Sequence, residues 1–241
     1  MANSRQKLFD QFLTSGFGQV NETEAEGIKK TASVYDWNYK KFIPQDKNIR
    51  ILDIGCGLGQ FLYWLKENGY NNFLGVDVSQ QMVDFCQKNI SEKVEKISSI
   101  IEFLRDKNEQ FDIIVMNDVI EHLEKGEIVD DLESIKAALK VGGKVIVKTN
   151  NAAAITGPRI RYEDFTHELG FTEYSLKQIF NVAGYSEVNI HAYDFPRTSI
   201  KRWARFIVQS VIHFFWKLIF FFEYTTVPKI VNELIFAVAT K

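Results

Sequence analysis

The chain has 241 residues, of which 46% are hydrophobic and 25% charged; this is an ordinary globular composition, and it excludes disorder as the main state. Its two cysteines, Cys56 and Cys86, exclude a disulfide framework and a four-cysteine zinc site. The net charge of -2 is unevenly spread, because residues 195–241 carry +5 and residues 1–194 carry -7, and an acidic body argues against nucleic acid as the main partner.

Strands and helices are predicted to alternate along most of the chain. Residues 1–47 are expected to form a helical cap, because apolar residues between Glu22 and Ile43 recur at helical spacing. Short apolar runs predict buried strands at 49–54, 73–78, 94–98, 111–116, 144–149, 187–193 and 234–239. Helices are predicted at 61–68, 80–90 (with Ser79 as N-cap), 100–105, 127–139 and 173–183, and residues 150–171 are expected to be irregular. This alternation predicts an α/β fold, with a largely parallel sheet covered on both faces in a domain over 48–241.

A glycine-rich loop, D-I-G-C-G-L-G at 53–59, follows the first predicted strand. Glycines allow a sharp turn and a close approach to a ligand, and the next helix offers unpaired N–H groups. The dinucleotide fingerprint G-x-G-x-x-G/A requires glycine or alanine at its last position. That position falls on Gln60 when the motif is counted from Gly55 and on Leu62 when it is counted from Gly57, so the sequence disfavours a nicotinamide oxidoreductase. Asp77, at the end of the second strand, has a carboxylate that could bind the two hydroxyls of a ribose. The alternative role of Asp77 is to favour the dipole of the following helix.

The segments ILDIGCGLG and LGVDVS resemble the first two cofactor motifs of class I S-adenosylmethionine-dependent methyltransferases, and the resemblance spans roughly residues 30–194. It implies S-adenosyl-L-methionine as cofactor, a Rossmann-like sheet of order 3-2-1-4-5-7-6, and an antiparallel last strand. It also implies that Asp53 lies near the methionine end of the cofactor and Asp77 on its ribose. The other cofactor-binding residues that we expect are Gly55, Cys56, Gly57, Gly59, Val78, Ser99, Ile100 and Asn117. Ser99 stands where relatives often carry an Asp that reaches adenine, so the backbone of Ile100 is expected to make that contact.

The fourth strand runs into N-D-V-I-E-H-L at 117–123, which resembles the D-V-x-E-H-L signature of a subgroup with ubiquinone O-methyltransferases and enzymes of surface-polysaccharide assembly. Ligands of parallel sheets bind at the carboxyl ends of strands, so we expect Asp118 to contact the acceptor. His122 is the first candidate for a general base, because a neutral imidazole suits proton removal near pH 7. Its alternative role is to orient or cap the next helix. Glu121 is expected to be structural.

A second polar cluster lies within PRIRYEDFTHELGFTEYSL, and its DFTHE and YSL segments resemble polysaccharide-cluster relatives. Arg161, Tyr162 and Asp164 are predicted to bind the acceptor, and His167 is the second candidate base. Arginines beside a histidine would suit an anionic acceptor. The alternative role of this cluster is that of a surface loop whose charges form salt bridges with one another. Asp118, His122, Asp164 and His167 could also gather a divalent metal. They lack a tight ligand spacing, so we expect no metal.

Residues 198–230 form an apolar insertion before the last strand. On a helical wheel, one half carries polar residues and the other half large apolar ones. The polar half holds Lys201, Arg202, Arg205, Gln209, His213 and Lys217. The apolar half holds Trp203, Ile207, Val211, Phe214, Leu218, Phe221 and Phe222. The polar stripe fits a helix that lies in a membrane surface through 200–222 better than one that spans the membrane. A face packed on the core or in a homodimer fits the same pattern equally well.

The leading hypothesis from the sequence is an S-adenosylmethionine-dependent methyltransferase, directed to an oxygen of a sugar, phosphate-bearing or other cell-envelope glycan precursor. The first alternative is a membrane-attached binding protein without catalysis, and a nicotinamide oxidoreductase is weaker. Arg5, Lys7 and Asp10 interrupt the opening residues, so we expect no signal peptide and a cytoplasmic protein, peripheral at the inner face of the cell membrane.

Overall fold

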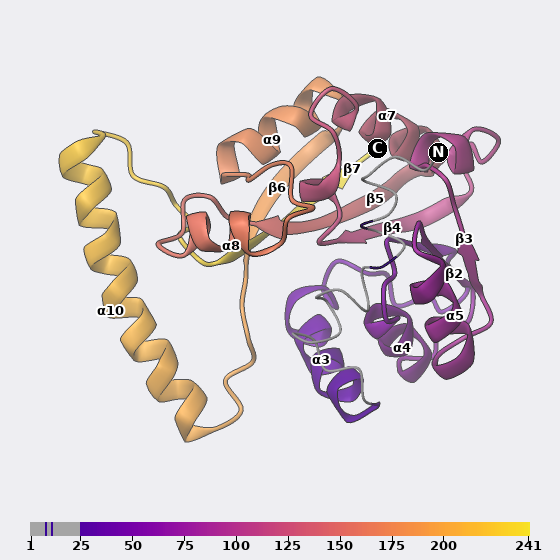
Figure 1. The fold of residues 1–241 in the computed structure, drawn as a ribbon, viewed down its shortest axis with the longest axis horizontal. Coiled ribbons are helices and arrows are strands. Elements are labelled where there is room, and N and C mark those ends of the chain that lie inside the picture. Colours follow the sequence, from indigo (N-terminus) through magenta and orange to yellow (C-terminus); the bar gives the residue numbers. More distant parts are fainter. Residues whose placement is uncertain (1–7, 9–10, 12–24) are drawn as a thin grey trace.

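A seven-stranded sheet of order β3-β2-β1-β4-β5-β7-β6 forms the centre of the protein (Figure 1). The computed structural model describes Leu8, Gln11 and residues 25–241; the rest of the expected 1–47 cap lies outside the described residues. The strands are β1 (Ile51–Ile54), β2 (Phe73–Asp77), β3 (Val94–Lys96), β4 (Phe111–Asn117), β5 (Leu139–Asn150), β6 (Ser186–Tyr193) and β7 (Leu234–Thr240). Strands β1 to β5 pair in parallel, and β7 is antiparallel to both β5 and β6. The predicted fold class, strand order and antiparallel last strand are confirmed.

Helices cover both faces of this sheet. The helical elements of the described residues are α3 (Ala25–Asn38), α4 (Gln60–Glu67), α5 (Gln80–Asn89), α6 (Ile100–Leu104), the 3-10 turn η2 (Ile120–His122), α7 (Ile128–Ala138), α8 (Gly157–Glu163), α9 (Glu173–Val182) and α10 (Ile200–Glu223). Of these, α10 stands apart from the sheet (Figure 1). Alternate residues of a strand point to opposite faces, and β4 shows this directly. Ile114 packs in the core with α6, α7 and α9, whereas its neighbour Ile113 packs in the core with α3, α4 and α5. Burial on both faces explains why the central strands are almost continuously apolar.

Three predicted elements differ from the structure. Strand β5 begins at Leu139, which pairs with Phe111 of β4, whereas the sequence predicted a helix up to 139 and a strand only from 144. The register shifts after this first pair, and regular pairing resumes where Lys144 meets Ile113. The expected irregular stretch contains the helix α8, with a proline in its first turn. The apolar insertion is helical only as far as Glu223.

The segment after α3 ties the amino-terminal part of the chain to the edge of the sheet where the strands end. Helix α3 stops at Asn38, whose side-chain amide donates to the carbonyls of Val34 and Asp194. The next residue, Tyr39, is fully buried, and its ring lies 6.1 Å from that of Phe61. This packing places the Tyr39 hydroxyl at the carboxyl end of β4.

Candidate functional site

The glycine loop between β1 and α4 has a backbone that only glycine adopts readily. Gly55, Gly57 and Gly59 all have positive φ, at 68°, 51° and 76°. A Cβ atom at Gly55 would lie 2.2 Å from Cγ2 of Val119, so the loop packs directly against the segment after β4. A Cβ at Gly57 would meet nothing within 4 Å. The loop therefore presents open backbone at Gly57, beside the carboxyl ends of the strands, where a ligand can approach closely.

Two buried carboxylates flank this loop. Asp77 accepts the N–H of Gly57 at 2.9 Å through one oxygen and the N–H of Ser79 at 2.8 Å through the other. Asp53 is 2% exposed, and its Oδ1 has no hydrogen-bond partner among the described residues. Burial, followed by the nearby Asp77, raises the pKa of Asp53, and Lys148 lowers it. A donor or a cation from a ligand would satisfy the Asp53 carboxylate, which fits a cofactor with an ammonium group and ribose hydroxyls.

Other residues expected at the cofactor are placed less directly. Cys56 is buried, and a hydrogen bond with Cys86 raises the pKa of the Cys56 thiol, so its side chain packs in the core. The hydroxyl of Ser99 caps α6 by accepting the N–H of Glu102 at 3.2 Å, and the side chain of Ile100 lies in the core. Val78 also packs against the core. These residues can face a cofactor mainly through their backbone. Their cofactor contacts stay predictions.

The end of β4 carries a polar group that joins three elements. Asn117 Oδ1 accepts a 2.6 Å hydrogen bond from the Tyr39 hydroxyl. Asp118, with a positive φ of 55°, pairs with Nζ of Lys148 on β5 at 2.5 Å. Burial lowers the pKa of Lys148, but Asp118 and further neighbours raise it more, and the net direction is upward. The ammonium of Lys148 therefore remains charged and forms an ion pair with Asp118 at the carboxyl end of β4.

Glu121 is a buried acid that holds the segment after β4 in place. Its Oε2 accepts a 3.0 Å hydrogen bond from Thr149, and its main-chain carbonyl accepts the N–H groups of Glu168 and Leu169. Burial, followed by the charge of Asp118, raises the pKa of Glu121 to about 8. Glu121 is therefore largely protonated at neutral pH.

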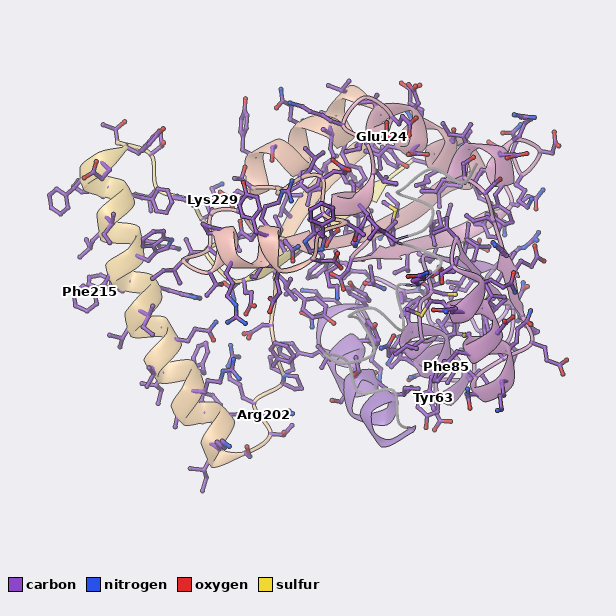
Figure 2. The ribbon with its side chains drawn as sticks, viewed as in Figure 1. Tyr63, Phe85, Glu124, Arg202, Phe215 and Lys229 are labelled. Carbon is purple, nitrogen blue, oxygen red and sulfur yellow. The ribbon has the colours of Figure 1, made fainter. Side chains whose placement is uncertain are left out.

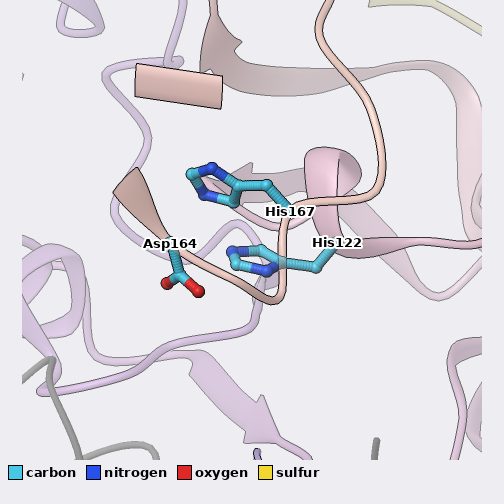
Figure 3. A group of neighbouring side chains, drawn as sticks. All are labelled: His122, Asp164 and His167. Atoms are coloured by element: carbon cyan, nitrogen blue, oxygen red, sulfur yellow. The ribbon is translucent and has the colours of Figure 1, made fainter. Parts of the chain in front are cut away.

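His122 lies on the turn η2 and contacts the loop that follows α8 (Figure 3). Its Nδ1 is 2.9 Å from the hydroxyl of Thr166, and that hydroxyl donates a 2.6 Å hydrogen bond to Oδ1 of Asp164. A hydroxyl has one proton, so while the carboxylate accepts it, the oxygen can only accept from Nδ1–H of His122. The chain of hydrogen bonds thus places the proton of neutral His122 on Nδ1 and the lone pair on Nε2.

His167 completes the group (Figure 3). Its ring centre lies 4.7 Å from that of His122, and its Nδ1 is 3.0 Å from the carbonyl of Ile160. Burial and the neighbouring His167 lower the pKa of His122 to about 4. His122, Asp164 and His167 each offer a ligand atom within 4.8 Å of the others, so these three residues could also hold a metal ion. Asp118, the fourth residue considered from the sequence, is instead paired with Lys148.

The remaining acceptor candidates, Arg161, Asp164 and Tyr162, make contacts within or beside their own loop, and their binding of the acceptor stays a prediction. The guanidinium of Arg161 donates to the main-chain carbonyls of His167 and Glu168, so it holds the loop that carries His167. Asp164 is the partner of Thr166 and anchors the same turn. Tyr162 is 79% exposed, with its ring 5.1 Å from the guanidinium carbon of Arg161. Of these three, Tyr162 is the one whose side chain is open to an approaching acceptor.

Three residues of the site were missed in the sequence: Tyr39, Lys148 and Thr166. Lys148 carries a detectable signal, because it is a cation within an otherwise apolar strand next to its carboxyl end. Tyr39 was recognised only as part of a helical apolar face. Thr166 had no distinguishing pattern, since its role depends on His122, which is 44 residues away.

Comparison with known proteins identifies the domain. A family model described as a methyltransferase domain matches residues 29–190, about two thirds of the chain. The chain is 29% identical over 126 residues to the ribosomal protein L11 methyltransferase of Thermotoga neapolitana, covering 52% of this chain and 47% of the relative. It is 31% identical over 137 residues to a ubiquinone biosynthesis O-methyltransferase of Bartonella quintana, covering 55% and 54%. The chain thus spans about half the length of these curated relatives.

A solved structure has the same fold. The S-adenosylmethionine-dependent methyltransferase of Archaeoglobus fulgidus superposes with a TM-score of 0.64 at 23% identity, covering 90% of this chain and 97% of the other. The cofactor of this domain is S-adenosyl-L-methionine, which agrees with the glycine loop and the two buried carboxylates described above.

Proposed function

The chain belongs to the methyltransferase-domain family, and we propose that it methylates a hydroxyl oxygen of a cell-envelope glycan precursor, with His122 as the general base. The observation that carries this proposal is the hydrogen-bonded series Asp164–Thr166–His122, which joins the loop after α8 to the turn η2 that follows β4. Val119, three residues before His122, packs on Gly55 of the glycine loop. The base is therefore held close to the loop that is expected to bind the cofactor.

S-adenosylmethionine, when bound, supplies a methyl group that is already activated by its sulfonium. The protein then has to align the acceptor and remove its proton. Nε2 of His122 has the lone pair for that step, because Nδ1–H is held by Thr166. The lowered pKa of about 4 keeps the ring neutral at physiological pH, and Asp164 stabilises the imidazolium that forms.

His167 and Lys148 assist in distinct ways. His167 raises the proportion of the neutral form of His122, since its ring lies beside that of His122 and lowers its pKa. Lys148 is a buried cation paired with Asp118, so it orients the side chain that was predicted to contact the acceptor. Both residues are proposed as parts of the acceptor site.

The glycan assignment is supported by the resemblance of residues 117–123 and 164–176 to enzymes of surface-polysaccharide assembly. It is also supported by the surroundings of the acceptor loop, where Tyr162 and Phe165 are 79% and 90% exposed. Exposed aromatic rings are suited to the apolar faces of sugars. We include in this proposal attachment at the inner face of the cell membrane, where a lipid-carried precursor would be found.

A methyl-transfer assay tests the proposal. The purified protein is incubated with S-adenosylmethionine carrying a tritiated methyl group and with envelope glycan precursors, each with and without its lipid carrier. We expect labelled product with at least one glycan, and loss of that product in His122→Asn while cofactor binding persists. Labelling confined to proteins or to amines, with glycans left unlabelled, would refute the oxygen-acceptor assignment.

A further inference from the structure

Helix α10 stands apart from the rest of the molecule (Figure 1). None of its residues is buried, and it supplies eleven of the 22 large hydrophobic side chains that are exposed among the described residues. It is also long and apolar enough to cross a membrane, by length and composition. Such a surface is rarely left in water by a soluble protein.

The orientation of the helix is the reverse of that in a helix packed on a core. Its half-buried residues are mainly Arg202, Phe206, Gln209, His213, Trp216, Lys217 and Phe220, which lie on the side toward the body. The side facing away carries Ile207, Val208, Val211, Phe214, Phe215 and Phe222, each at least half exposed. Figure 2 shows Phe215 pointing away from the body and Arg202 on the opposite side of the helix. The polar half of the helix therefore faces the protein, and the apolar half faces outward.

Contacts at both ends and along α10 maintain this orientation. Nε1 of Trp216 donates to the carbonyl of Ala153 at 2.9 Å, and Nζ of Lys217 donates to the carbonyl of Lys229 at 2.6 Å. At the amino-terminal end, Arg202 donates to the carbonyl of Pro196. The Trp216 bond holds the inward side of the helix against the segment before α8, and the other two fix the helix to the segments that connect it to β6 and β7.

The connection to the sheet decides how such a helix can meet a bilayer. Tyr193, the last residue of β6, pairs with Leu234, the first residue of β7, so both connections to α10 start from one place. The helix has 24 residues and is about 36 Å long, which exceeds the ~30 Å hydrocarbon core. If α10 crossed the bilayer, the ten residues between Glu223 and Leu234 would have to cross back as unpaired backbone. Hydrocarbon does not tolerate such a segment, so a spanning arrangement is excluded while β6 and β7 remain paired.

Charge indicates which surface the helix fits. The exposed side chains of Lys201 and Arg205 lie near its amino-terminal end, and Arg197 and Arg202 are close by in the chain. Glu223, at the other end, is the single acidic residue of α10. Cations beside an outward apolar face complement the negative headgroups of an anionic leaflet.

We propose that α10 lies in the plane of an anionic membrane surface, with its Phe214–Phe222 side in the acyl region and Lys201 and Arg205 among the headgroups. The hydrogen bond between Trp216 and Ala153 connects this helix to the segment that leads into α8 and the acceptor loop. The bound helix thus holds the acceptor site beside the lipid surface. This docking does not depend on the methyl-transfer chemistry, so it can be tested separately from the proposed function.

Vesicle flotation tests the docking. The full chain is mixed with phosphatidylcholine vesicles that contain phosphatidylglycerol, at low and at high salt. We expect binding at low salt, weakened by salt, and a loss of more than about 100-fold when Phe214, Phe215 and Phe222 are replaced by Ser. Replacing Tyr174 and Val182 by Ser is the matched control, because these two residues are 75% and 63% exposed on α9, and binding should be unchanged.

Charge reversal tests the headgroup contact. Lys201→Glu together with Arg205→Glu should weaken binding by more than about 30-fold, since each basic residue lost from the surface removes about fivefold and each new carboxylate is repelled by the anionic headgroups. Lys177→Glu, on α9, should have no effect. Thermal unfolding of the Ser and Glu variants should match wild type, because none of the replaced side chains is buried.

Labelling on sealed vesicles distinguishes an in-plane helix from a spanning one. Cysteines are introduced singly at Ile200 and at Glu223, while Cys56 and Cys86 are buried. A membrane-impermeant maleimide added outside should react at both ends of the helix. Protection of one end would show a spanning helix and overturn the proposal. It would also be overturned if wild type stays unbound at low salt, or if light scattering shows a dimer that the Ser variant dissociates.

Discussion

Replacing the buried acid Glu121 by Gln should stabilise the protein at neutral and alkaline pH. Glu121 is 1% exposed, and its pKa is raised from 4.5 to about 8 by burial and then by Asp118. An acid with a raised folded-state pKa binds a proton that the unfolded chain releases, so folding is increasingly penalised as pH rises from about 4.5 to about 8. At pH 7 the unfolded-state pKa lies about 2.5 units below the pH, which gives a penalty of about 3 kcal/mol.

Gln removes that penalty while keeping the local contacts. Its amide oxygen can accept the hydrogen bond of Thr149, as the protonated acid does. Urea unfolding of wild type and Glu121→Gln should show a stability difference of about 3 kcal/mol at about pH 7 and less than about 1 kcal/mol at about pH 5. Glu92→Gln, on the surface, is the control and should change stability little at either pH. A difference that does not vary with pH, or a Gln variant less stable than wild type at about pH 8, would refute the burial argument.

The other predictions concern the cofactor and the base. Asp77→Ala should weaken S-adenosylmethionine binding by about 1–3 kcal/mol, and Gly57→Val should abolish binding because its side chain fills the open side of the loop. Calorimetry that finds wild-type affinity in both variants would contradict the assignment of this loop as the cofactor site. If the acceptor is a hydroxyl, His122→Ala should lower kcat by about 10²–10⁴-fold with cofactor affinity nearly unchanged, and full turnover would remove His122 as the base. Thr166→Val should lower kcat by a smaller factor, because it removes the group that fixes the tautomer of His122, and rescue by Thr166→Ser is expected. The lowered pKa keeps His122 in its neutral form down to about pH 5, so kcat should stay constant from neutral pH to about pH 6, where most of an ordinary histidine is protonated. A fall in kcat with a midpoint at about pH 6.5 would contradict this.

Much of the fold could be predicted from the sequence, because the signals are local. A buried parallel strand is recognised by a short run of apolar residues, and a covering helix by apolar residues spaced three or four positions apart. Both patterns lie within a few neighbouring residues of the chain. The glycine loop was equally visible, since positive φ at Gly55, Gly57 and Gly59 requires glycine independently of the rest of the chain. The errors lie at boundaries such as the start of β5, where Leu139 pairs with Phe111 of β4 ahead of a register shift that precedes the regular pairing from Lys144.

The site was only partly visible from the sequence. His122 and Asp164 could be identified as candidates because each lies in a polar segment that follows a predicted strand. Their connection through Thr166 could not be predicted, because it joins residues more than 40 positions apart. Arg161 is predicted from the sequence to bind the acceptor, but the sequence did not indicate that its guanidinium also donates to the carbonyls of His167 and Glu168 in its own loop. A side chain's partners depend on how distant segments pack, and the local sequence does not encode that packing in a readable form.

The amphipathic pattern of α10 shows the same division. The sequence by itself determined that residues 200–222 have a polar half and an apolar half, because helical periodicity is a property of the segment alone. Only the tertiary structure decided that the polar half faces the protein, through contacts such as that of Trp216 with Ala153. It also decided that both ends of the helix return to one place on the sheet, since the pairing of Tyr193 with Leu234 joins residues 41 positions apart. That pairing, which no local pattern contains, is what argues against a helix that crosses a bilayer.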